Sequence, residues 1–485
     1  MADGTNPRFD FAAPLPRLAD LGRVHFVAIG GSGMSAVARL LLGRGVAVSG
    51  SDAKDSATLQ ALAAEGAAVH VGHDPALLDG VDTVVVSSAI PETNPELARA
   101  RELGLPVLHR SQALTVAAQG FRRVAVAGAN GKTTTTSMIA VALLAAGADP
   151  SFASGSDLPG HDTNARIGAG EGFVIEADES DGSFLVYRPE VAVVTNVQPD
   201  HLDFYGTFER VQAAYDAFVA TRAEGGLLVA CHDDAGSLAL ARRDAGADRR
   251  VVTYGFDPAA DVVLSDAVAA VRDEGGFSAS ATVTGPDGVS RPLRVAMPGR
   301  HNLQNAAAAY AASVLGLGVD ADAVLAGLAD FTGARRRFEV IGTAGGVTVV
   351  DDYAHNAGKV TALVHTAVGL VGSDRVRVIF QPHLYSRTRD FADGFGAGLA
   401  AADDVVLLPI YGAREEPMPG VTSELVADAV RRHNPKAQVD VETDRTELVR
   451  RLAERARPGD LVLVVGAGDV TTLAPEILAA IGGAQ

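Results

Sequence analysis

The chain has 485 residues, of which 47% are hydrophobic and 21% are charged. This is the composition of a globular protein rather than a disordered one, and the length suggests about three domains. A formal net charge of −18 without a visible basic stripe argues against nucleic acid as the main ligand.

The cysteine usage, the start of the sequence and the lengths of its apolar runs give no indication of export or membrane insertion. The single cysteine, Cys231, excludes an internal disulfide and fits a reducing cytoplasm. Residues 1–22 form a polar, proline-containing lead-in that lacks the basic start and apolar core of a signal peptide. Because no apolar run approaches about 18 residues, we expect no membrane span.

The first predicted strand, residues 24–29, runs into the turn Gly30-Gly31-Ser32-Gly33 and then into a helical apolar pattern. A second strand ends at Ser51-Asp52. An acidic residue roughly 20 positions after a glycine turn is typical of a dinucleotide-binding fingerprint, in which the carboxylate meets a ribose. A tight turn that serves only packing is the alternative interpretation.

Strand–helix alternation continues to about Gly120, with further strands predicted at residues 69–73, 81–88 and 107–109. This order predicts a doubly wound parallel sheet. Ligands of such sheets bind at the carboxyl ends of the strands. We therefore expect a nucleotide or a diphosphate-bearing ligand near Gly30-Gly31 and Ser87-Ser88.

A second glycine turn, Gly128-Ala129-Asn130-Gly131, follows the predicted strand at residues 124–127 and precedes Lys132 and four threonines. Glycines let backbone N–H groups approach phosphate oxygens, the following helix adds partial positive charge, and lysine adds a full charge. The stretch therefore predicts a triphosphate cradle of the shorter G-x-x-G-K-T form. An ordinary glycine-rich turn is the alternative.

Carboxylates gather behind the next predicted strands, after a loop-like stretch at residues 151–166. An apolar strand beginning at Phe173 delivers Glu176, Asp178, Glu179 and Asp181, which repel one another unless a cation lies among them. Another strand, residues 191–196, leads to Asp200-His201. Carboxylates at a strand end beside a phosphate loop predict a magnesium site, whereas a solvated acidic turn is the alternative.

Residues 227–297 are strand-rich, and an alanine-rich helix with Asn302 and Asn305 near its start follows them. Amides three positions apart share one helix face and suit the edge of a purine. Capping of the helix by Asn302 is the alternative.

A third unit begins near Gly333, where Arg335, Arg336 and Arg337 form the most concentrated basic spot of the chain. The three arginines predict an anion-binding clamp or, alternatively, a solvated linker. Four strands are predicted at residues 347–350, 376–380, 404–408 and 461–465, each followed by polar residues. Such strand ends indicate a second wall of an active site.

Taken together, the motifs resemble those of the Mur ligase family of peptidoglycan synthesis over nearly the whole chain. The stretches that carry the resemblance are HFVAIGGSGMS, GANGKTTTT, EADESDGSF, NVQPDHLD, PGRHNLQN, RRFE, DDYAH, FQPHLYSRT, REEP and GAGD. The resemblance implies an α/β fold of three domains: a Rossmann-like UDP-sugar domain (1–120), a central ATPase domain of the P-loop type (121–333), and a Rossmann-like domain for the amino acid and part of the nucleotide (334–485).

The resemblance also implies a role for individual residues. Those for the nucleotide-sugar would be Gly30, Gly31, Ser32, Gly33, Ser51, Asp52, Ser87, Arg110, Thr163 and Asn164. Those for ATP would be Gly128, Ala129, Asn130, Gly131, Lys132, Thr133, Thr134, Asn302, Asn305, Arg337 and Asp351. The magnesium ligands would be Thr133, Glu179 and His201. Tyr353, His355 and Arg387 would meet the amino acid, and catalysis would rest on Lys132, Glu179, His201, His355 and Arg387.

The activity implied is ATP-dependent ligation of L-alanine to the lactyl carboxylate of UDP-N-acetylmuramate through an acyl phosphate, with Mg²⁺ as cofactor and Gly120 and Gly333 as candidate hinges. The sequence departs from the alanine-adding branch at Ala129-Asn130, Asn356-Ala357 and Leu384, whereas Tyr215, in place of the carbamylated lysine of sister ligases, fits that branch. Two alternatives stay open: a recycling ligase that attaches a tripeptide to the same UDP-sugar, and a non-catalytic nucleotide-binding regulator.

Overall fold

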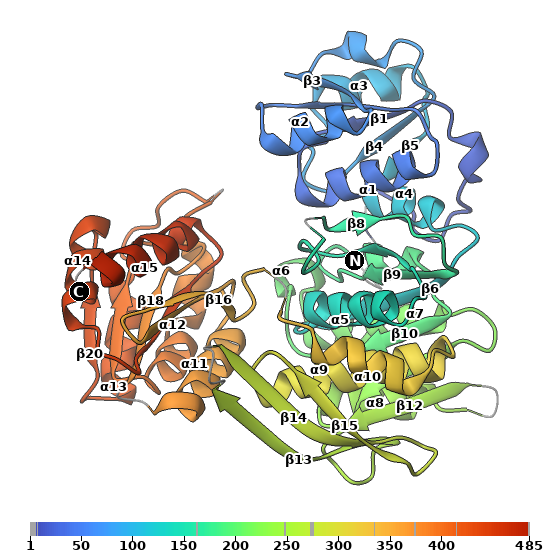
Figure 1. The fold of residues 1–485 in the computed structure, drawn as a ribbon. Coiled ribbons are helices and arrows are strands. Elements are labelled where there is room, and N and C mark those ends of the chain that lie inside the picture. Colours follow the sequence, from blue (N-terminus) through green and yellow to red (C-terminus); the bar gives the residue numbers. More distant parts are fainter. Residues whose placement is uncertain are drawn as a thin grey trace. The chain divides into compact units, whose positions relative to one another are not determined.

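A computed structural model describes residues 6, 8–161, 163–246, 249–271, 276–333, 335–372, 375–413 and 415–483. The chain divides into two compact units, which are best considered one at a time (Figure 1). The first unit comprises Met1–Ala267, Ala281–Arg294 and His301–Phe331, and the second comprises Val268–Ser280, Val295–Arg300 and Thr332–Gln485. Within the described part of the chain, no helix combines the length and the apolar character needed to cross a membrane.

The first sheet is parallel and doubly wound, with strand order β3-β2-β1-β4-β5, which confirms the prediction. Its strands are β1 (Val24–Val27), β2 (Val48–Asp52), β3 (Ala68–Val71), β4 (Thr83–Val86) and β5 (Val107–His109). Its helices are α1 (Ser32–Gly43), α2 (Ala57–Ala64), α3 (Pro95–Glu102) and α4 (Arg110–Ala117). The strands β1 and β4 are buried along their whole length because helices cover both faces of the sheet.

The second sheet has ten strands in the order β15-β14-β13-β12-β11-β10-β6-β9-β7-β8. They are β6 (Arg122–Ala127), β7 (Ser151–Ala153), β8 (Ala165–Arg166), β9 (Gly172–Glu176), β10 (Val191–Val194), β11 (Leu227–Cys231), β12 (Arg250–Gly255), β13 (Val262–Val271), β14 (Phe277–Thr284) and β15 (Ser290–Val295). The associated helices are α5 (Lys132–Ala145), α6 (Leu202–Tyr205), α7 (Phe208–Ala220), α8 (Ala235–Asp244), α9 (Arg300–Tyr310) and α10 (Ala321–Ala329).

Two expectations about this region need correction. The stretch 151–166, expected to be a loop, begins with β7 and ends with β8, and these two short strands pair antiparallel at the sheet edge. The stretch 227–297 is rich in strands as predicted but also contains α8, which Asp234 caps by accepting a hydrogen bond from the Ser237 N–H. Strand β6 lies between β10 and β9, so the phosphate loop starts from a strand that is paired on both sides.

The third sheet has six strands in the order β16-β17-β21-β18-β19-β20. They are β16 (Glu339–Ala344), β17 (Val347–Asp352), β18 (Val376–Phe380), β19 (Asp404–Leu407), β20 (Gln438–Val441) and β21 (Leu461–Val465). The helices are α11 (Ala357–Val371), α12 (Tyr385–Leu399), α13 (Glu424–His433), α14 (Arg445–Arg455) and α15 (Leu473–Gly483). The four predicted strands are confirmed, but β20 and the antiparallel edge strand β16 were not predicted.

Residues 8–22 of the amino-terminal lead-in pack into the first unit. The side chains of Phe9 and Phe11 are buried, and their ring centroids lie 4.9 and 5.3 Å from that of His109. The side-chain amide of Gln119 donates a hydrogen bond to the Pro16 carbonyl over 2.8 Å. Phe9 and Phe11 are therefore part of the hydrophobic core, which the polar composition of the lead-in concealed.

Candidate active site

The phosphate loop has a shape that two of its glycines impose. Gly128 has φ +142° and Gly131 has φ +87°, and α5 begins at the next residue, Lys132. A Cβ on Gly128 would overlap the Thr195 hydroxyl, and one on Gly131 would lie 2.7 Å from Asn305 Oδ1. The loop therefore combines a left-handed backbone with close neighbours, which only glycine tolerates.

The middle of the loop is held by the end of the neighbouring strand β10. The Thr195 hydroxyl and the Asn196 side-chain amide donate to the Asn130 carbonyl over 2.6 and 2.9 Å, and the Asn130 N–H donates to Asn196 Oδ1 over 2.9 Å. The Asn130 side chain donates in turn to Gln198 Oε1 over 3.1 Å. These bonds hold the loop against the end of β10, and the side chain at the departing position, Asn130, adds one of them.

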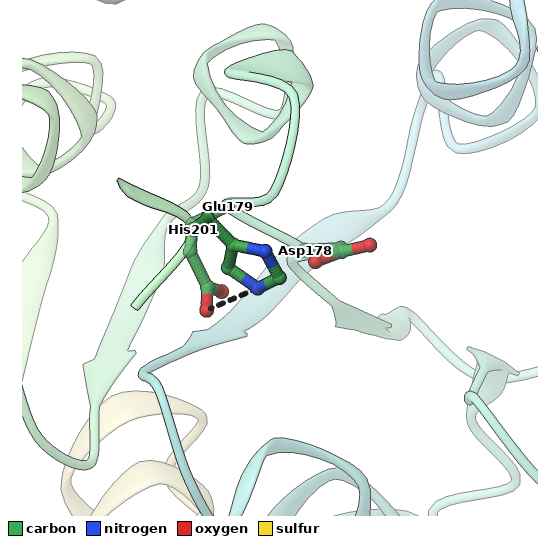
Figure 2. Close-up of side chains that lie close together, drawn as sticks. All are labelled: Asp178, Glu179 and His201. Carbon is green, nitrogen blue, oxygen red and sulfur yellow. Dashed lines mark ion pairs between the residues drawn. The ribbon is translucent and has the colours of Figure 1, made fainter. Parts of the chain in front are cut away.

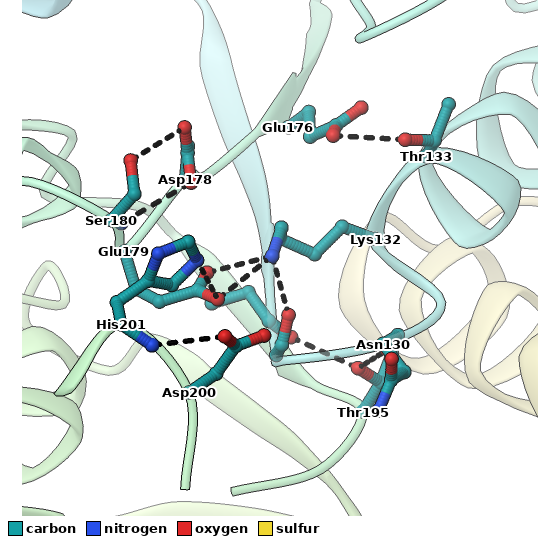
Figure 3. A network of polar contacts seen from close by, with 12 residues as sticks. Asn130, Lys132, Thr133, Glu176, Asp178, Glu179, Ser180, Thr195, Asp200 and His201 are labelled. Carbon is teal, nitrogen blue, oxygen red and sulfur yellow. Dashed lines mark hydrogen bonds and ion pairs between the residues drawn. The ribbon is translucent and has the colours of Figure 1, made fainter. Parts of the chain in front are cut away.

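Lys132 is directed back over the loop and onto a carboxylate (Figure 3). Its ammonium donates to the Gly128 carbonyl over 2.7 Å and to Glu179 Oε1 over 2.8 Å, and Glu179 is only 2% exposed. Burial alone would lower the pKa of Lys132, but the charges of Glu179 and Asp178 outweigh burial and raise it. The lysine is therefore fully charged at neutral pH.

Asp178, Glu179 and His201 form the one group of histidine and acidic side chains, among the described residues, in which three ligand atoms lie within 4.8 Å of one another (Figure 2). His201 Nε2 lies 3.8 Å from Glu179 Oε1, and His201 itself has the left-handed φ of +51° just before α6. Burial raises the pKa of Glu179, and the neighbouring Asp178 charge adds to that effect. Two carboxylates and an imidazole with too little positive charge around them fit a divalent cation. Because Glu179 is buried, a solvated acidic turn is the wrong interpretation for this residue.

Thr133 lies outside this cluster. Its hydroxyl donates to Glu176 Oε1 over 2.9 Å (Figure 3). The other oxygen of Glu176 accepts from the Gly155 N–H over 2.6 Å. The structure therefore brings Glu179 and His201 together with Asp178, and pairs Thr133 with Glu176. Neither Asp178 nor Glu176 was among the predicted metal ligands, although both belong to the predicted run of carboxylates.

Asn302 and Asn305 are buried on α9, where the Asn305 side chain donates to Asn302 Oδ1 over 3.3 Å. Because α9 begins at Arg300, Asn302 lies inside the helix, and the interpretation of Asn302 as the helix cap is wrong. The close approach of Asn305 to Gly131 places this pair of amides beside the phosphate loop. The predicted adenine-binding residues therefore lie next to the predicted phosphate-binding residues.

At the carboxyl edge of the first sheet, the glycine turn after β1 is bonded to the end of β2. Asp52 Oδ2 accepts from the Gly30 N–H over 3.0 Å. A Cβ on Gly33 would lie 2.6 Å from Arg110 Nη1, so Arg110 lies against the first turn of α1. The side-chain amide of Asn164 donates to the Ser32 carbonyl over 3.2 Å. The structure thus gathers these predicted nucleotide-sugar residues at one edge, with Ser87 half-buried at the end of β4.

A contact that the sequence did not predict joins this edge to the acidic strand end. The Ser88 hydroxyl donates to Asp181 Oδ2 over 2.6 Å, and His109 Nε2 lies 3.2 Å from the Ser88 oxygen and 3.4 Å from Asp181. Burial lowers the pKa of His109 to about 4, although the Asp181 charge opposes this effect. Nothing in the spacing of these residues along the chain signals the contact.

In the second unit, the predicted residues gather at the carboxyl edge of the third sheet. The His355 ring lies 5.1 Å from that of Tyr353, the Arg337 guanidinium lies 5.5 Å over the Tyr353 ring, and His355 Nδ1 is 2.9 Å from the Tyr353 carbonyl. Burial and the charges of Lys359 and Arg387 lower the pKa of His355 to about 3. His355 is therefore a neutral group among cations.

Two other predicted features of this edge are engaged by the protein itself. Asp351 accepts from the Thr471 hydroxyl over 2.5 Å, and burial raises its pKa. Arg336 donates to the Gly466 carbonyl over 2.6 Å, which shows that this arginine run is not a solvated linker. Asn356, a departure from the family's usual residue, caps α11 by accepting from the Lys359 N–H over 2.9 Å.

A phosphate loop with a buried lysine–carboxylate pair, a cluster suited to a divalent cation, and two further α/β sheets with polar carboxyl edges define a phosphate-loop enzyme that uses a nucleotide. The chain belongs to the Mur ligase family. Residues 23–122 match "Mur ligase family, catalytic domain", residues 126–313 match "Mur ligase middle domain" and residues 336–468 match "Mur ligase, glutamate ligase domain".

Named relatives resemble the chain over almost its full length. A UDP-N-acetylmuramate–L-alanine ligase of Kineococcus radiotolerans is 56% identical over 470 residues, which cover 96% of this chain and 98% of the relative. The structure of a UDP-N-acetylmuramate–alanine ligase of Thermotoga maritima has 27% identity and a TM-score of 0.77, and the match covers 96% of this chain and 100% of that one. A murein peptide ligase of Psychrobacter arcticus shares the fold, with 24% identity and a TM-score of 0.66 over 95% of this chain and 99% of its own.

Proposed function

We propose that this chain is an ATP-dependent ligase that joins L-alanine to the lactyl carboxylate of UDP-N-acetylmuramate and releases ADP and phosphate, a cytoplasmic step of peptidoglycan synthesis. The observation that carries the proposal is the 56% identity to a ligase named for this reaction, because it extends across all three sheets. The tripeptide-adding alternative has weaker support, since the murein peptide ligase is 24% identical and shares only the fold.

The chemistry requires activation of a poor electrophile. An oxygen of the lactyl carboxylate attacks the γ-phosphorus of ATP, and ADP leaves. The neutral amine of L-alanine then attacks the acyl carbon, phosphate departs with its bonding electrons, and the proton that the amine nitrogen loses ends on the phosphate. Phosphoryl transfer depends on neutralised charge and in-line positioning. Lys132 is suited to the first task because its ammonium lies at the loop beside Gly128 and is fully charged.

We assign ATP to the loop Gly128–Thr134, with Asn302 and Asn305 at the adenine. Arg337 would contact a phosphate and Asp351 the ribose, as the family pattern implies. The positions of the two amides beside Gly131 support the first part of this assignment. The charged Lys132 ammonium at the loop supports it further, since an ammonium is a strong donor to phosphate oxygens.

We assign Mg²⁺ to Glu179 and His201 together with the Thr133 hydroxyl, and the geometry adds Asp178 and Glu176 as neighbouring carboxylates. The donor set fits, because oxygen and imidazole ligands of net negative charge gather where Glu179 has a raised pKa. When bound, the cation supplies neutralisation of phosphate charge. The residues of this chain hold its ligands in place through Lys132 and through the left-handed turn at His201.

The remaining assignments follow the three sheets. The nucleotide-sugar would lie along Gly30–Gly33, Asp52, Arg110 and Asn164, and L-alanine would meet Tyr353, His355 and Arg387, with Arg387 as partner of its carboxylate. We place the domain boundaries at 120/121 and 333/334. Gly120 and Gly333 have φ of +88° and +106°, a backbone freedom that suits hinges for closure over a water-sensitive acyl phosphate.

Phosphate release from ATP tests the function directly. The purified chain would receive UDP-N-acetylmuramate with L-alanine, with glycine or serine, or with the tripeptide, each in a separate reaction. Release that needs both the sugar and L-alanine is the expected result. Release with the tripeptide alone would move the chain to the recycling branch, and nucleotide binding without release in any reaction would favour a regulator.

A further inference from the structure

A buried carboxylate that the proposed mechanism does not use lies beneath the carboxyl edge of the first sheet. Glu96, on α3, is 0% exposed. Its Oε2 accepts from the Ser51 hydroxyl over 2.6 Å, and its Oε1 accepts from the Asp74 N–H over 3.0 Å. His25 Nε2 and His73 Nδ1 lie 3.5 and 3.4 Å from Oε2. We call His25, Ser51, His73 and Glu96 the Glu96 network.

The proton positions in this network follow from its donors. Burial alone would raise the pKa of Glu96, but hydrogen bonds from His25, Ser51 and the Asp74 backbone outweigh burial and lower it. An ionised carboxylate only accepts hydrogen bonds, so the single hydrogen of the Ser51 hydroxyl is given to Glu96. The Ser51 oxygen can then only accept from its other neighbour, His73 Nδ1, at 2.9 Å.

This chain of hydrogen bonds fixes the tautomer of His73. Its proton is held on Nδ1, which leaves a lone pair on Nε2, the nitrogen on the opposite side of the ring. The His73 side chain is 22% exposed, whereas Ser51 and Glu96 are fully buried. The edge of the first sheet therefore presents a hydrogen-bond acceptor whose polarity is set from inside the fold.

The place of His73 in the sheet matches the base end of a bound nucleotide. In doubly wound sheets, the diphosphate lies at the glycine turn after the first strand, and the ribose meets the acidic residue at the end of the second. Here these are Gly30–Gly33 and Asp52. Strand β3 pairs with β2 on the side away from β1, and His73 follows β3 two residues after its end. A base that extends past Asp52, away from the glycine turn, would therefore lie on the side of the edge where His73 follows β3.

We propose that His73 Nε2 accepts the N3–H of uracil and thereby selects a uridine nucleotide-sugar over a cytidine one, with Ser51 and Glu96 as positioning residues. The inference rests on the proposed function for the identity of the substrate. Uracil presents a donor at N3, whereas cytosine presents a lone pair there. With a cytidine analogue, His73 Nε2 and cytosine N3 would face each other as two acceptors with no hydrogen between them, and both would stay unpaired.

Direct binding measures this selection without requiring ligation. Calorimetry without ATP would compare UDP-N-acetylmuramate with its CDP counterpart for the wild type and for His73→Ala. We expect the wild type to prefer the uridine compound by at least about 10²-fold, because a site that hydrogen-bonds one substrate group rejects the analogue that lacks it. His73→Ala should bring the ratio to within about tenfold of unity.

Conservative variants separate recognition from folding. Glutamine can present an acceptor near the position of Nε2, whereas asparagine reaches only as far as Nδ1, so His73→Gln should keep part of the preference and His73→Asn should not. Glu96→Gln should also lower the ratio, because it frees the Ser51 hydroxyl and with it the His73 tautomer. His70, exposed on β3, gives the matched control, and His70→Ala should keep the wild-type ratio.

Each outcome decides the inference. Equal affinity of the wild type for the two compounds, or an unchanged ratio in His73→Ala, would overturn it even if ligation with L-alanine is established. Selective uridine binding that His73→Ala abolishes would support it even if the phosphate-release assay fails. Absence of binding to either compound would overturn the inference and the proposed substrate together.

Discussion

The first sheet and the second sheet, which is the central one in the chain, each bury a carboxylate at the carboxyl edge. The pKa values of the two carboxylates shift in opposite directions. The carboxyl edge of the second sheet is called the central edge below. Glu96 has a lowered pKa because hydroxyl, imidazole and backbone donors surround it, whereas Glu179 has a raised pKa because burial and Asp178 outweigh the single ammonium of Lys132. The Glu96 carboxylate thus has its donors within the fold. The carboxyl edge of the second sheet is short of positive charge, as expected of a site that binds a cation.

The difference suggests a division of labour within the first unit. A carboxylate held by neutral donors gives a rigid wall that can read the shape and hydrogen-bonding pattern of a ligand. A cluster with excess negative charge attracts the cation that arrives with the nucleotide, and that cation can stabilise the charge that develops during phosphoryl transfer. Substitutions at the two edges should therefore affect different measurements: turnover at the central edge, and specificity or stability at the first.

The largest effect is expected for Lys132→Ala, which removes the ammonium that contacts Glu179 at the central edge. We expect kcat for phosphate release to fall by about 10³-fold or more, because neutralisation of the transferring phosphoryl group is lost. Calorimetric affinity for UDP-N-acetylmuramate should change little, since that ligand is assigned to the other edge. Normal ligation by Lys132→Ala would refute the assignment of the central edge as the catalytic one.

A smaller but still large loss is expected for Gly131→Ala. The substitution adds a Cβ at φ +87° and 2.7 Å from Asn305 Oδ1, so the loop or the adenine-side amide must move. We expect kcat/KM for ATP to fall by about 10²-fold, because misplacement of positioning groups by about 1 Å has an effect of this size.

Gly147→Ala provides the matched control for the loop variant. Gly147 follows the other end of α5 with a similar φ of +74°, but a Cβ there meets nothing within 4 Å. It should cost about 1 kcal/mol of stability from the left-handed backbone and leave KM for ATP unchanged. Equal losses of activity in the two variants would mean that strain in α5, rather than contact with the loop, limits Gly131.

The comparison also shows which features the sequence could predict. Each part of the central edge comes from a short run of neighbouring residues, Gly128–Thr133 or Glu176–Asp181. The spacing within each run was therefore enough to predict a phosphate loop and a group of acidic residues. The Glu96 network depends on β2, the turn after β3 and α3, and Glu96 looks like an ordinary charged residue of a helix. Only the fold shows that α3 directs this carboxylate beneath β2, so no local pattern could predict it.

The same reasoning explains what else the sequence did not show. Magnesium binding by Thr133 together with Glu179 and His201 stays a prediction, and a one-dimensional run of carboxylates does not say that the Thr133 hydroxyl donates to Glu176 while Lys132 donates to Glu179. Phe9 and Phe11 were assigned to a polar lead-in because proline and charge dominate its composition, yet two aromatic rings suffice to anchor it on His109. The strand β20 was missed because its short alternating sequence carries only a weak signal.

His109 connects the two edges, and its titration should be visible in stability. Its pKa is lowered from 6.5 to about 4, so the unfolded chain takes up a proton first as the pH falls. The stabilisation is therefore complete above pH 6.5 and is lost between about pH 6.5 and 4, by roughly 3 kcal/mol. His109→Asn keeps a cap for α4 but cannot titrate. As the pH falls from about 6.5 to 4, the melting temperature of the wild type should therefore fall relative to that of the variant.

A further loss of stability is expected for Glu96→Gln, and the pH window in which it changes, rather than its sign, separates it from His109. The pKa of Glu96 is lowered below 4.5, so its ionised form stabilises the fold above that pH, and the stabilisation is lost as the pH falls through the folded-state value. At pH 7 the variant should melt below the wild type by an amount equivalent to about 1–3 kcal/mol, the usual cost of disrupting buried hydrogen bonds to a charged group.

Because His109 titrates equally in both proteins, its contribution cancels in the difference. The melting gap should therefore stay constant from pH 7 to pH 5 and narrow only below about pH 4.5. A gap that narrows already between pH 7 and pH 5 would mean that a histidine of the network, rather than the carboxylate, carries the titrating proton, and it would remove the basis for a fixed His73 tautomer.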